Sequence, residues 1–135
     1  MKYTLALITA FTSTSLAQEN SKLGSLVNLL GKEDRVIASQ YRCTPKLSTG
    51  SNKAQRICTD DELSTIKFQL TNNRISSIAT TVPRFYASLD EVKAELSAIC
   101  TRSRDTNFIC EEGHQVTLMN GGDGVSIKMC HALVC

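Results

Sequence analysis

The chain has two histidines, and one of them, His114, lies beside residues that could share a proton with it. Glu111 and Glu112 precede it, and a carboxylate next to an imidazole can act as a general acid–base pair. Adding Arg102 and Arg104 would complete a ribonuclease-like site, because phosphoryl transfer needs an acid, a base and cations on the phosphate. These residues fall on predicted turns, where side chains are usually solvated. A hydrolase using His114 with an acidic neighbour is therefore kept as the alternative function, and no residue is assigned a catalytic role.

Signatures of nucleophilic and phosphate chemistry are absent from the sequence. It contains no Gly-x-Ser-x-Gly motif that would present a nucleophilic serine. Residues 120–124, Asn-Gly-Gly-Asp-Gly, could approach a ligand closely because glycine lacks a side chain. They lack the Gly-Lys-Ser/Thr ending of a phosphate loop and the ordered acidic ligands of a calcium loop. We predict a flexible hairpin there.

The sequence contains an even number of cysteines, which in an exported chain predicts disulfides. Two pairs bracket polar connections, Cys43 with Cys58 and Cys100 with Cys110. A bond between Cys130 and Cys135 is harder, because five residues of strand span roughly 16 Å and a disulfide needs Cα atoms within about 7 Å. It forms only if the C-terminus turns back. The connectivity stays open, since six cysteines allow 15 pairings.

A zinc site is the competing interpretation of the same region. Its ligands would come from Cys110, His114, Cys130, His131 and Cys135. The segment has no Cys-x-x-Cys knuckle, and thiols in an oxidising compartment pair with each other. The sequence therefore predicts neither a metal nor another cofactor.

Residues 1–17 have the order of features found in a secretory signal peptide. Lys2 supplies the basic start, residues 5–11 are mainly apolar, and Ser15-Leu16-Ala17 suits cleavage before Gln18. No later segment approaches the roughly 20 apolar residues of a spanning helix. We expect a secreted or periplasmic protein without a membrane span after signal removal.

The charge balance names no partner by itself. Fifteen basic and thirteen acidic residues give a net charge of +2. Such a balance provides no polybasic field, and the arginines have no interleaved aromatic residues for base stacking, so nucleic acid is not an expected partner. One short segment fits a protein interface. Arg84, Phe85 and Tyr86 follow one another in a predicted strand-to-helix loop, and these residue types are enriched in interface hot spots.

The predicted elements form an α+β domain in which a curled antiparallel sheet of about five to six strands packs on one main helix, residues 88–100. Ser88 and Glu91 form a capping box at the start of that helix. Residues 18–34 are expected to form an N-terminal amphipathic helix or arm, and residues 35–135 a single α+β domain. A small open barrel closed around the main helix is the alternative. The predicted strands are residues 36–43, 66–70, 75–82, 108–110, 116–119 and 125–129.

Residues 44–56 and 101–107 are predicted loops, and Thr59 with Glu62 matches the spacing of another capping box. The combined pattern favours a disulfide-stabilised binding module without catalytic activity, such as a protein inhibitor or surface-interaction protein. A secreted effector is a further alternative that the sequence does not separate from it, and the oligomeric state stays open.

Overall fold

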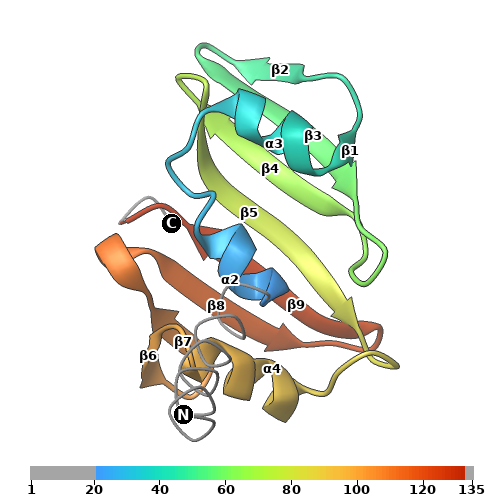
Figure 1. The fold of residues 1–135 in the computed structure, drawn as a ribbon, viewed down its shortest axis with the longest axis vertical. Coiled ribbons are helices and arrows are strands. Elements are labelled where there is room, and N and C mark those ends of the chain that lie inside the picture. The colour runs from blue at the N-terminus through green and yellow to red at the C-terminus, as the bar shows by residue number, and fades with distance from the viewer. Residues whose placement is uncertain (1–20, 133–135) are drawn as a thin grey trace, which may run out of the picture.

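An antiparallel sheet organises residues 21–132, the part of the chain that the computed structural model describes. Nine strands lie in this described part, in the order β1-β3-β4-β5-β9-β8-β7-β6, with β2 also paired to β3. Figure 1 shows the sheet twisting from β2 at one end to β6 at the other. The strands are β1 (Arg42–Cys43), β2 (Leu47–Gly50), β3 (Lys53–Thr59), β4 (Ile66–Thr71), β5 (Arg74–Pro83), β6 (Thr101–Arg104), β7 (Asn107–Ile109), β8 (Gln115–Asn120) and β9 (Gly124–Cys130).

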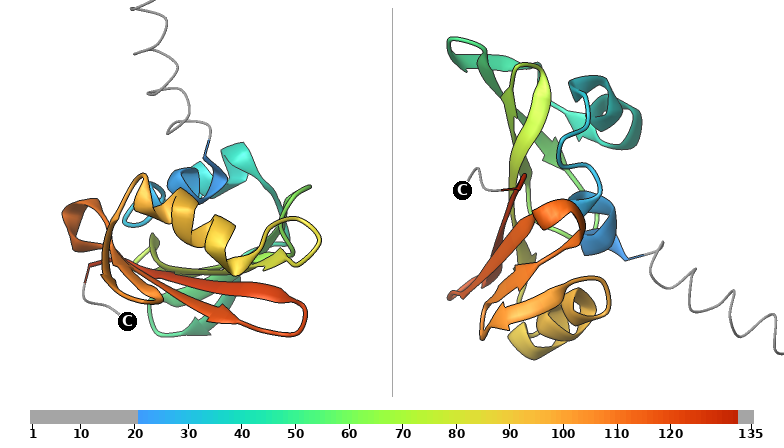
Figure 2. Two further views of the ribbon diagram at one scale, coloured as in Figure 1. Left: turned by 90° about the horizontal axis from the view of Figure 1, so that it is seen from below. Right: turned by 90° about the vertical axis from the view of Figure 1, so that its left-hand side faces the viewer.

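The helices of the described residues cover one face of this sheet, as the edge-on view in Figure 2 shows. They are α2 (Lys22–Val27), α3 (Asp34–Gln40) and α4 (Leu89–Ser97). Side chains alternate along the strands beneath them, so that Ile66 and Phe68 of β4 are buried while Lys67 is exposed. The alternation identifies the helix-covered face as the core side of the sheet.

The predicted α+β class with an antiparallel sheet is confirmed, but two parts of that prediction need correction. The sheet has more than the five to six strands expected. Its edges are β6 on one side and β1 and β2 on the other, which differs from the barrel kept as the alternative. The helix expected to organise the fold makes a smaller contribution, since α4 buries Val92 and Leu96 only. The N-terminal helix α2 and the turn after it bury more, namely Leu23, Leu26, Val27, Leu29 and Leu30.

The predicted strand over residues 36–43 is wrong, because most of it is helix α3. Asp34 places a carboxylate in the first turn, where the helix dipole favours negative charge, and Ala38, Ser39 and Gln40 are compatible with a helix. Ile37 is the one buried residue of α3, so the β-branched pair at its start does not mark a strand. Only Arg42 and Cys43 are extended.

Three segments predicted as loops or as a capped helix start have a different structure from the one predicted. Strands β2 and β3 occupy most of residues 44–56, and β6 lies within residues 101–107. They were missed because their side chains are mostly polar and exposed or half-buried. No helix follows Thr59. Instead, the Asp60 carboxylate accepts hydrogen bonds from the N–H groups of Glu62 and Leu63, forming a turn closed by a side chain.

The hairpin joining β4 and β5 is confirmed, as are the three consecutive strands β7, β8 and β9. Asn72 and Asn73 adopt φ angles of 53° and 67°, the left-handed conformation that asparagine tolerates in a tight turn. The capping box that starts α4 is confirmed as well, with both Ser88 and Glu91 bonds present.

Two of the expected disulfides are present, Cys43–Cys58 and Cys100–Cys110. The first joins directly opposed residues of β1 and β3, and the second joins the segment after α4 to the residue after β7. Cys130 is also disulfide-bonded, whereas Cys135 and the expected signal peptide lie outside the described residues. Disulfides persist in oxidising compartments, which favours a location outside the cytosol. None of the described helices has the length and hydrophobicity needed to span a membrane.

The exported chain should contain three intramolecular disulfides. Two are present among the described residues, and the even cysteine count leaves one more pair. Intact-mass analysis of the mature protein is expected to give a mass six hydrogens below that of the reduced form. Two alkylatable thiols in the folded protein would contradict this expectation.

Leu96→Ala should lower the free energy of unfolding by about 2–5 kcal/mol, because its fully buried side chain would leave a cavity under α4. Ser97→Ala is the matched control, since Ser97 is exposed on the same helix and should change stability by less than about 0.5 kcal/mol. Glu95 is not a suitable control because its carboxylate accepts a hydrogen bond from Ser21. Denaturant melts with the disulfides intact measure the stability of Leu96→Ala and Ser97→Ala. Equal midpoints for the two variants would show that α4 does not cover the core.

Candidate functional site

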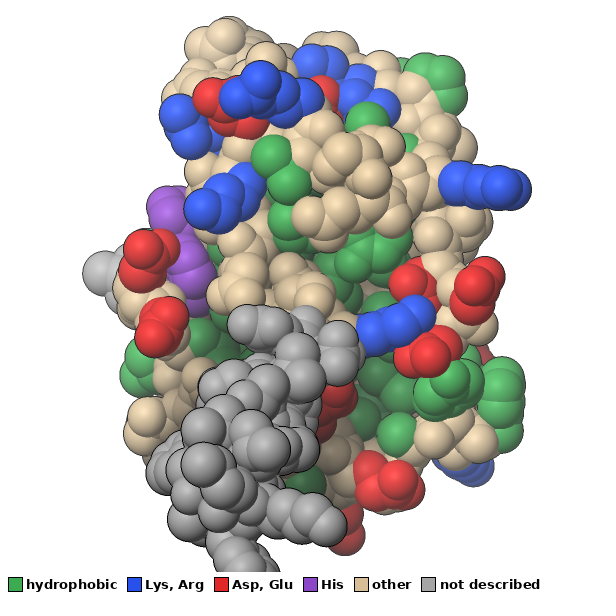
Figure 3. Space-filling view, viewed as in Figure 1, with side chains coloured by type: hydrophobic (Ala, Val, Ile, Leu, Met, Phe, Trp, Pro, Cys, Tyr) green, Lys and Arg blue, Asp and Glu red, His purple; other side chains and the backbone are tan. Residues whose placement is uncertain are grey.

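Two histidines line a cleft of about 500 Å³ between the turn after α2 and the loop joining β7 to β8. We call it the histidine cleft, with Gly31, Lys32, Cys110, Glu112, His114 and His131 among its walls. Figure 3 shows histidine side chains at one edge of the helix-covered face, beside acidic side chains. The cleft thus brings His114 and a carboxylate together, as the hydrolase alternative requires.

His114 is not the solvated hairpin-tip residue that the sequence suggested, because its side chain is only 4% exposed. It follows a 3-10 turn, Glu111–Gly113, in which Glu112 has a φ angle of 63°. The ring is held on both sides. Its Nδ1 accepts a hydrogen bond from the N–H of Ala132 at 3.1 Å, and its Nε2 lies 3.5 Å from a Glu112 carboxylate oxygen.

His131 lies against His114, with 4.8 Å between the ring centroids. It comes from the segment after β9, and its backbone N–H bonds to the Ser76 carbonyl. The ring also packs on Gly31, where a Cβ atom would lie 2.9 Å from His131 Cε1. Gly31 has a φ angle of +83°, so this position needs glycine for both its conformation and the ring beside it.

Burial lowers the pKa of His114, and the neighbouring His131 lowers it further, while Glu112 opposes both effects. A buried imidazole is harder to charge because the protonated form loses its hydration. His131 Nδ1 is itself buried without a hydrogen-bond partner among the described residues. The pair is therefore a packed contact that links the α2–α3 turn to the end of β9.

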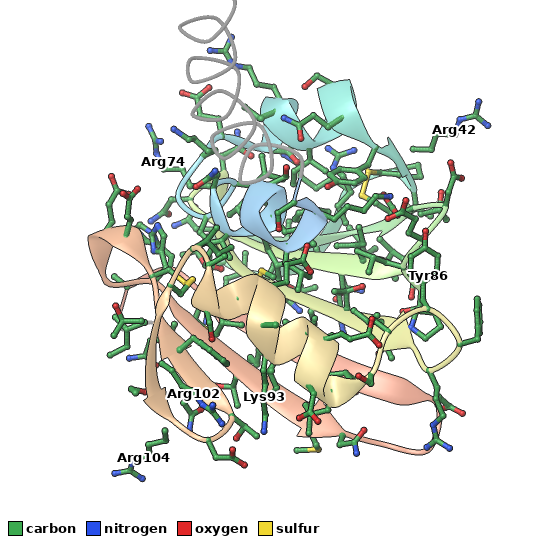
Figure 4. All side chains as sticks on the ribbon, turned by 60° about the horizontal axis from the view of Figure 1, so that its bottom comes forward. Arg42, Arg74, Tyr86, Lys93, Arg102 and Arg104 are labelled. Atoms are coloured by element: carbon green, nitrogen blue, oxygen red, sulfur yellow. A yellow bond between two sulfur atoms is a disulfide. The ribbon has the colours of Figure 1, made fainter. Side chains whose placement is uncertain are left out.

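This arrangement gives His114 little capacity for proton transfer to a substrate. A neutral imidazole has one lone pair, and on His114 the Ala132 N–H already occupies it. The arginines of the ribonuclease-like proposal are not brought into the cleft. Arg102 lies on β6 at 2.5 Å from Asp105, and Figure 4 shows Arg102 and Arg104 at the edge strand. Cys110 is in a disulfide, and no group of residues within 21–132 is arranged to hold a metal ion.

The second candidate site is the loop predicted to bind a partner. Phe85 is 89% exposed and Tyr86 48% exposed, and their ring centroids lie 6.3 Å apart. They are the two exposed aromatic side chains in residues 21–132. Figure 4 shows Tyr86 on the connection that leads into α4, away from Arg102 and Arg104. Aromatic residues are enriched at protein interfaces, where their large side chains become buried.

Backbone hydrogen bonds hold this loop in shape. The Pro83 carbonyl accepts bonds from the N–H groups of Tyr86 and Ala87, and the Arg84 N–H donates to the Asp123 carbonyl. The Arg84 guanidinium donates to the Gly121 carbonyl at 3.0 Å. The loop is thereby tied to the β8–β9 turn, so its backbone need not be ordered when a partner binds.

Acidic residues of the β3–β4 connection lie beside Tyr86. Desolvation and the nearby Glu62 carboxylate raise the pKa of Tyr86. Lys22 of α2 contacts Asp60 at 2.6 Å and Glu62 at 3.5 Å. Although burial opposes it, the Lys22 hydrogen bond and two backbone N–H groups hold the pKa of Asp60 below its ordinary value.

The sequence did not indicate that residues 60–62 adjoin the aromatic pair. Their acidic run was explained by a helix start, and the contact with Tyr86 spans more than 20 residues of chain. The contact of His131 with Gly31 was hidden for the same reason. Neither pair has a local sequence signal, because both depend on how the strands pair.

No protein-family model matches the chain, and no curated protein matches its sequence. Among solved structures, it is similar to a cysteine-rich secretory protein from Staphylococcus aureus, with a TM-score of 0.46 and 11% sequence identity. The similarity covers 83% of this chain and 47% of that chain, so the chain spans about half the length of that protein. A likeness this weak leaves the function to be argued from the geometry of the sites.

The lowered pKa of His114 predicts that the protein loses stability in mild acid. In the unfolded chain His114 titrates near pH 6.5, so the unfolded state binds more protons than the native state below that pH. The contribution is fully present above about pH 6.5 and is lost as the pH falls toward the native pKa. Denaturant melts at pH 7.5 and 5.0 should show a smaller acid-induced loss for His114→Gln than for the unaltered protein.

An NMR titration of the His114 ring provides an independent readout if the variant folds poorly. Its midpoint in the unaltered protein should fall below that of a free histidine. A midpoint above 6.5, or an identical pH dependence of the two proteins, would contradict the inference that the ring is kept neutral by burial.

Proposed function

We propose that this chain is an exported, disulfide-stabilised binding module that contacts another protein through the loop at residues 83–87. The observation that carries this proposal is the 89% exposure of Phe85 next to a half-exposed Tyr86. Burying an exposed phenyl ring in a partner removes a large apolar surface from water, which is the dominant favourable contribution to association.

The fixed conformation of the loop supports this role. Hydrogen bonds to Pro83, Gly121 and Asp123 hold its backbone and Arg84. A rigid loop loses less conformational entropy on binding than a mobile one, and the disulfides at both ends of the sheet limit local unfolding. These are the properties expected of a protein inhibitor or surface-interaction module.

The hydrolase alternative receives less support from the geometry. The histidine cleft contains His114 and Glu112, but the imidazole is 4% exposed and both its nitrogens face groups of the protein. A general base needs a lone pair within hydrogen-bond reach of the substrate. The histidine cleft is therefore better explained as a packing contact that fixes the end of β9.

Phe85→Ala should remove partner capture while leaving the fold intact. The test immobilises the mature protein, captures proteins from the surrounding extracellular fraction, and compares the variant with Met119→Ala. Met119 is 70% exposed on β8, so it controls for loss of a large exposed apolar side chain elsewhere. We expect the retained partner band to drop at least about tenfold for Phe85→Ala, as for a hot-spot residue, and to persist for Met119→Ala.

Equal capture by all three proteins would contradict the assignment of the loop as the interface. Thermal melts of the variants identify any effect of misfolding. His114→Ala offers a second discrimination, because abolition of a turnover activity in a folded variant would favour the hydrolase.

A further inference from the structure

We propose that the loop and the acidic residues beside it form one recognition surface for an arginine-bearing segment of the partner protein. This inference rests on the function proposed above and adds the chemistry of the partner. We call the surface the aromatic–acidic patch and define it as Asp60, Asp61, Glu62, Phe85 and Tyr86.

The rings provide a face on which a cation can lie. Phe85 is 89% exposed, and its ring plane is inclined by 60° to that of Tyr86 at a centroid distance of 6.3 Å. The face of an aromatic ring is electron-rich and attracts a cation within about 6 Å of its centre. Phe85 therefore has room for a flat guanidinium.

The carboxylates provide negative charge next to those rings. The β3–β4 connection lies beside the end of β5, because the Ser64 N–H donates to the Thr81 carbonyl at 3.1 Å. Desolvation and the nearby Glu62 carboxylate raise the pKa of Tyr86. Asp61 is exposed on the same connection. Two further acidic residues, Asp90 and Glu91, lie in the first turn of α4 directly after the loop.

The basic residues already at this surface do not cancel its charge. Lys22 is shared between Asp60 and Glu62, which leaves Asp61 for an external cation. Arg84, on the loop itself, directs its guanidinium to the Gly121 carbonyl. The patch therefore combines open ring faces with the exposed Asp61 carboxylate, while Lys22 is engaged by Asp60 and Glu62 and Arg84 by Gly121.

The distribution of charge over the molecule also favours a cationic partner here. Figure 3 shows acidic side chains interspersed with basic ones next to hydrophobic side chains on the lower right, whereas basic side chains predominate at the top. A local negative field steers basic segments toward the patch and disfavours acidic ones. The near-neutral total charge of +2 conceals this separation.

Arginine fits the patch better than lysine. Its guanidinium is planar, so it can stack on Phe85 and still donate hydrogen bonds in its plane to a carboxylate. An ammonium group is more strongly hydrated and cannot stack. We therefore expect a preference for arginine over lysine at equal peptide charge.

The direct test titrates the mature protein with acetylated, amidated tri-arginine peptide and follows its amide and aromatic NMR signals. Shifts should concentrate on Phe85, Tyr86 and residues 60–62, with smaller shifts for the tri-lysine peptide. Phe85→Ala and Asp61→Asn should each weaken tri-arginine binding by about two- to fivefold, the amount expected for loss of one exposed cation–π or ionic contact.

Glu112→Gln is the matched control, because Glu111 and Glu112 form an exposed acidic pair without an exposed phenyl or phenol ring. It should leave tri-arginine binding unchanged. Equal shifts at Glu112 and Glu62, or tri-arginine and tri-lysine binding of equal strength, would overturn the proposal. If the peptide fails to bind while partner capture still depends on Phe85, the recognition chemistry is wrong and the binding function stands. If both fail, the proposed function is wrong as well.

Discussion

The pairing of β5 with β9 is the interaction on which the rest of the structure depends. It joins the strands before residue 84 to those after residue 100 through seven opposed residue pairs, from Ser77 with Cys130 to Pro83 with Gly124. At its last pair the strands approach so closely that a Cβ atom on Gly124 would collide with the Val82 carbonyl. Without this pairing, β5 and β9 would each become an edge strand with unpaired backbone N–H and C=O groups.

The two candidate sites lie at opposite ends of the β5–β9 pairing. At one end, Pro83 terminates β5 and the loop that carries Phe85 bonds back to the β8–β9 turn. At the other end, β9 runs into His131, whose backbone bonds to Ser76 and whose ring packs on Gly31. The sheet thus holds the loop outward as a rigid surface feature and holds the histidines inward as a packed contact. That difference in burial is the reason the binding role fits the loop better than catalysis fits His114.

The sequence predicted those elements in which burial of one face makes apolar residues recur at regular spacing. β4, β8 and β9 alternate apolar and polar residues, and α4 begins with a capping box that acts locally. It failed for β3 and β6, because strands near the sheet edges have little apolar alternation to reveal them. It also failed for α3, where Val36 and Ile37 suggested a strand although both lie in a helix that buries Ile37.

The two candidate sites also differ in whether local sequence predicts them. Exposed aromatic residues in a loop could be recognised from their type and position, and Arg84, Phe85 and Tyr86 remain the predicted binding residues. The burial of His114 could not be recognised from the sequence. It arises from contacts with Ala132 and His131, which reach His114 only after β8 and β9 have paired. The contact of Glu62 with Tyr86 likewise depends on the β3–β4 connection lying beside the end of β5.

Hydrogen exchange of the mature protein, compared between its free and partner-bound forms, tests whether the loop at residues 83–87 is the interface. Protection on binding should be confined to peptides covering residues 59–63 and 83–91. Protection at residues 30–33, 110–114 and 128–132 instead would show that the histidine cleft receives the ligand and would contradict the assignment of the loop.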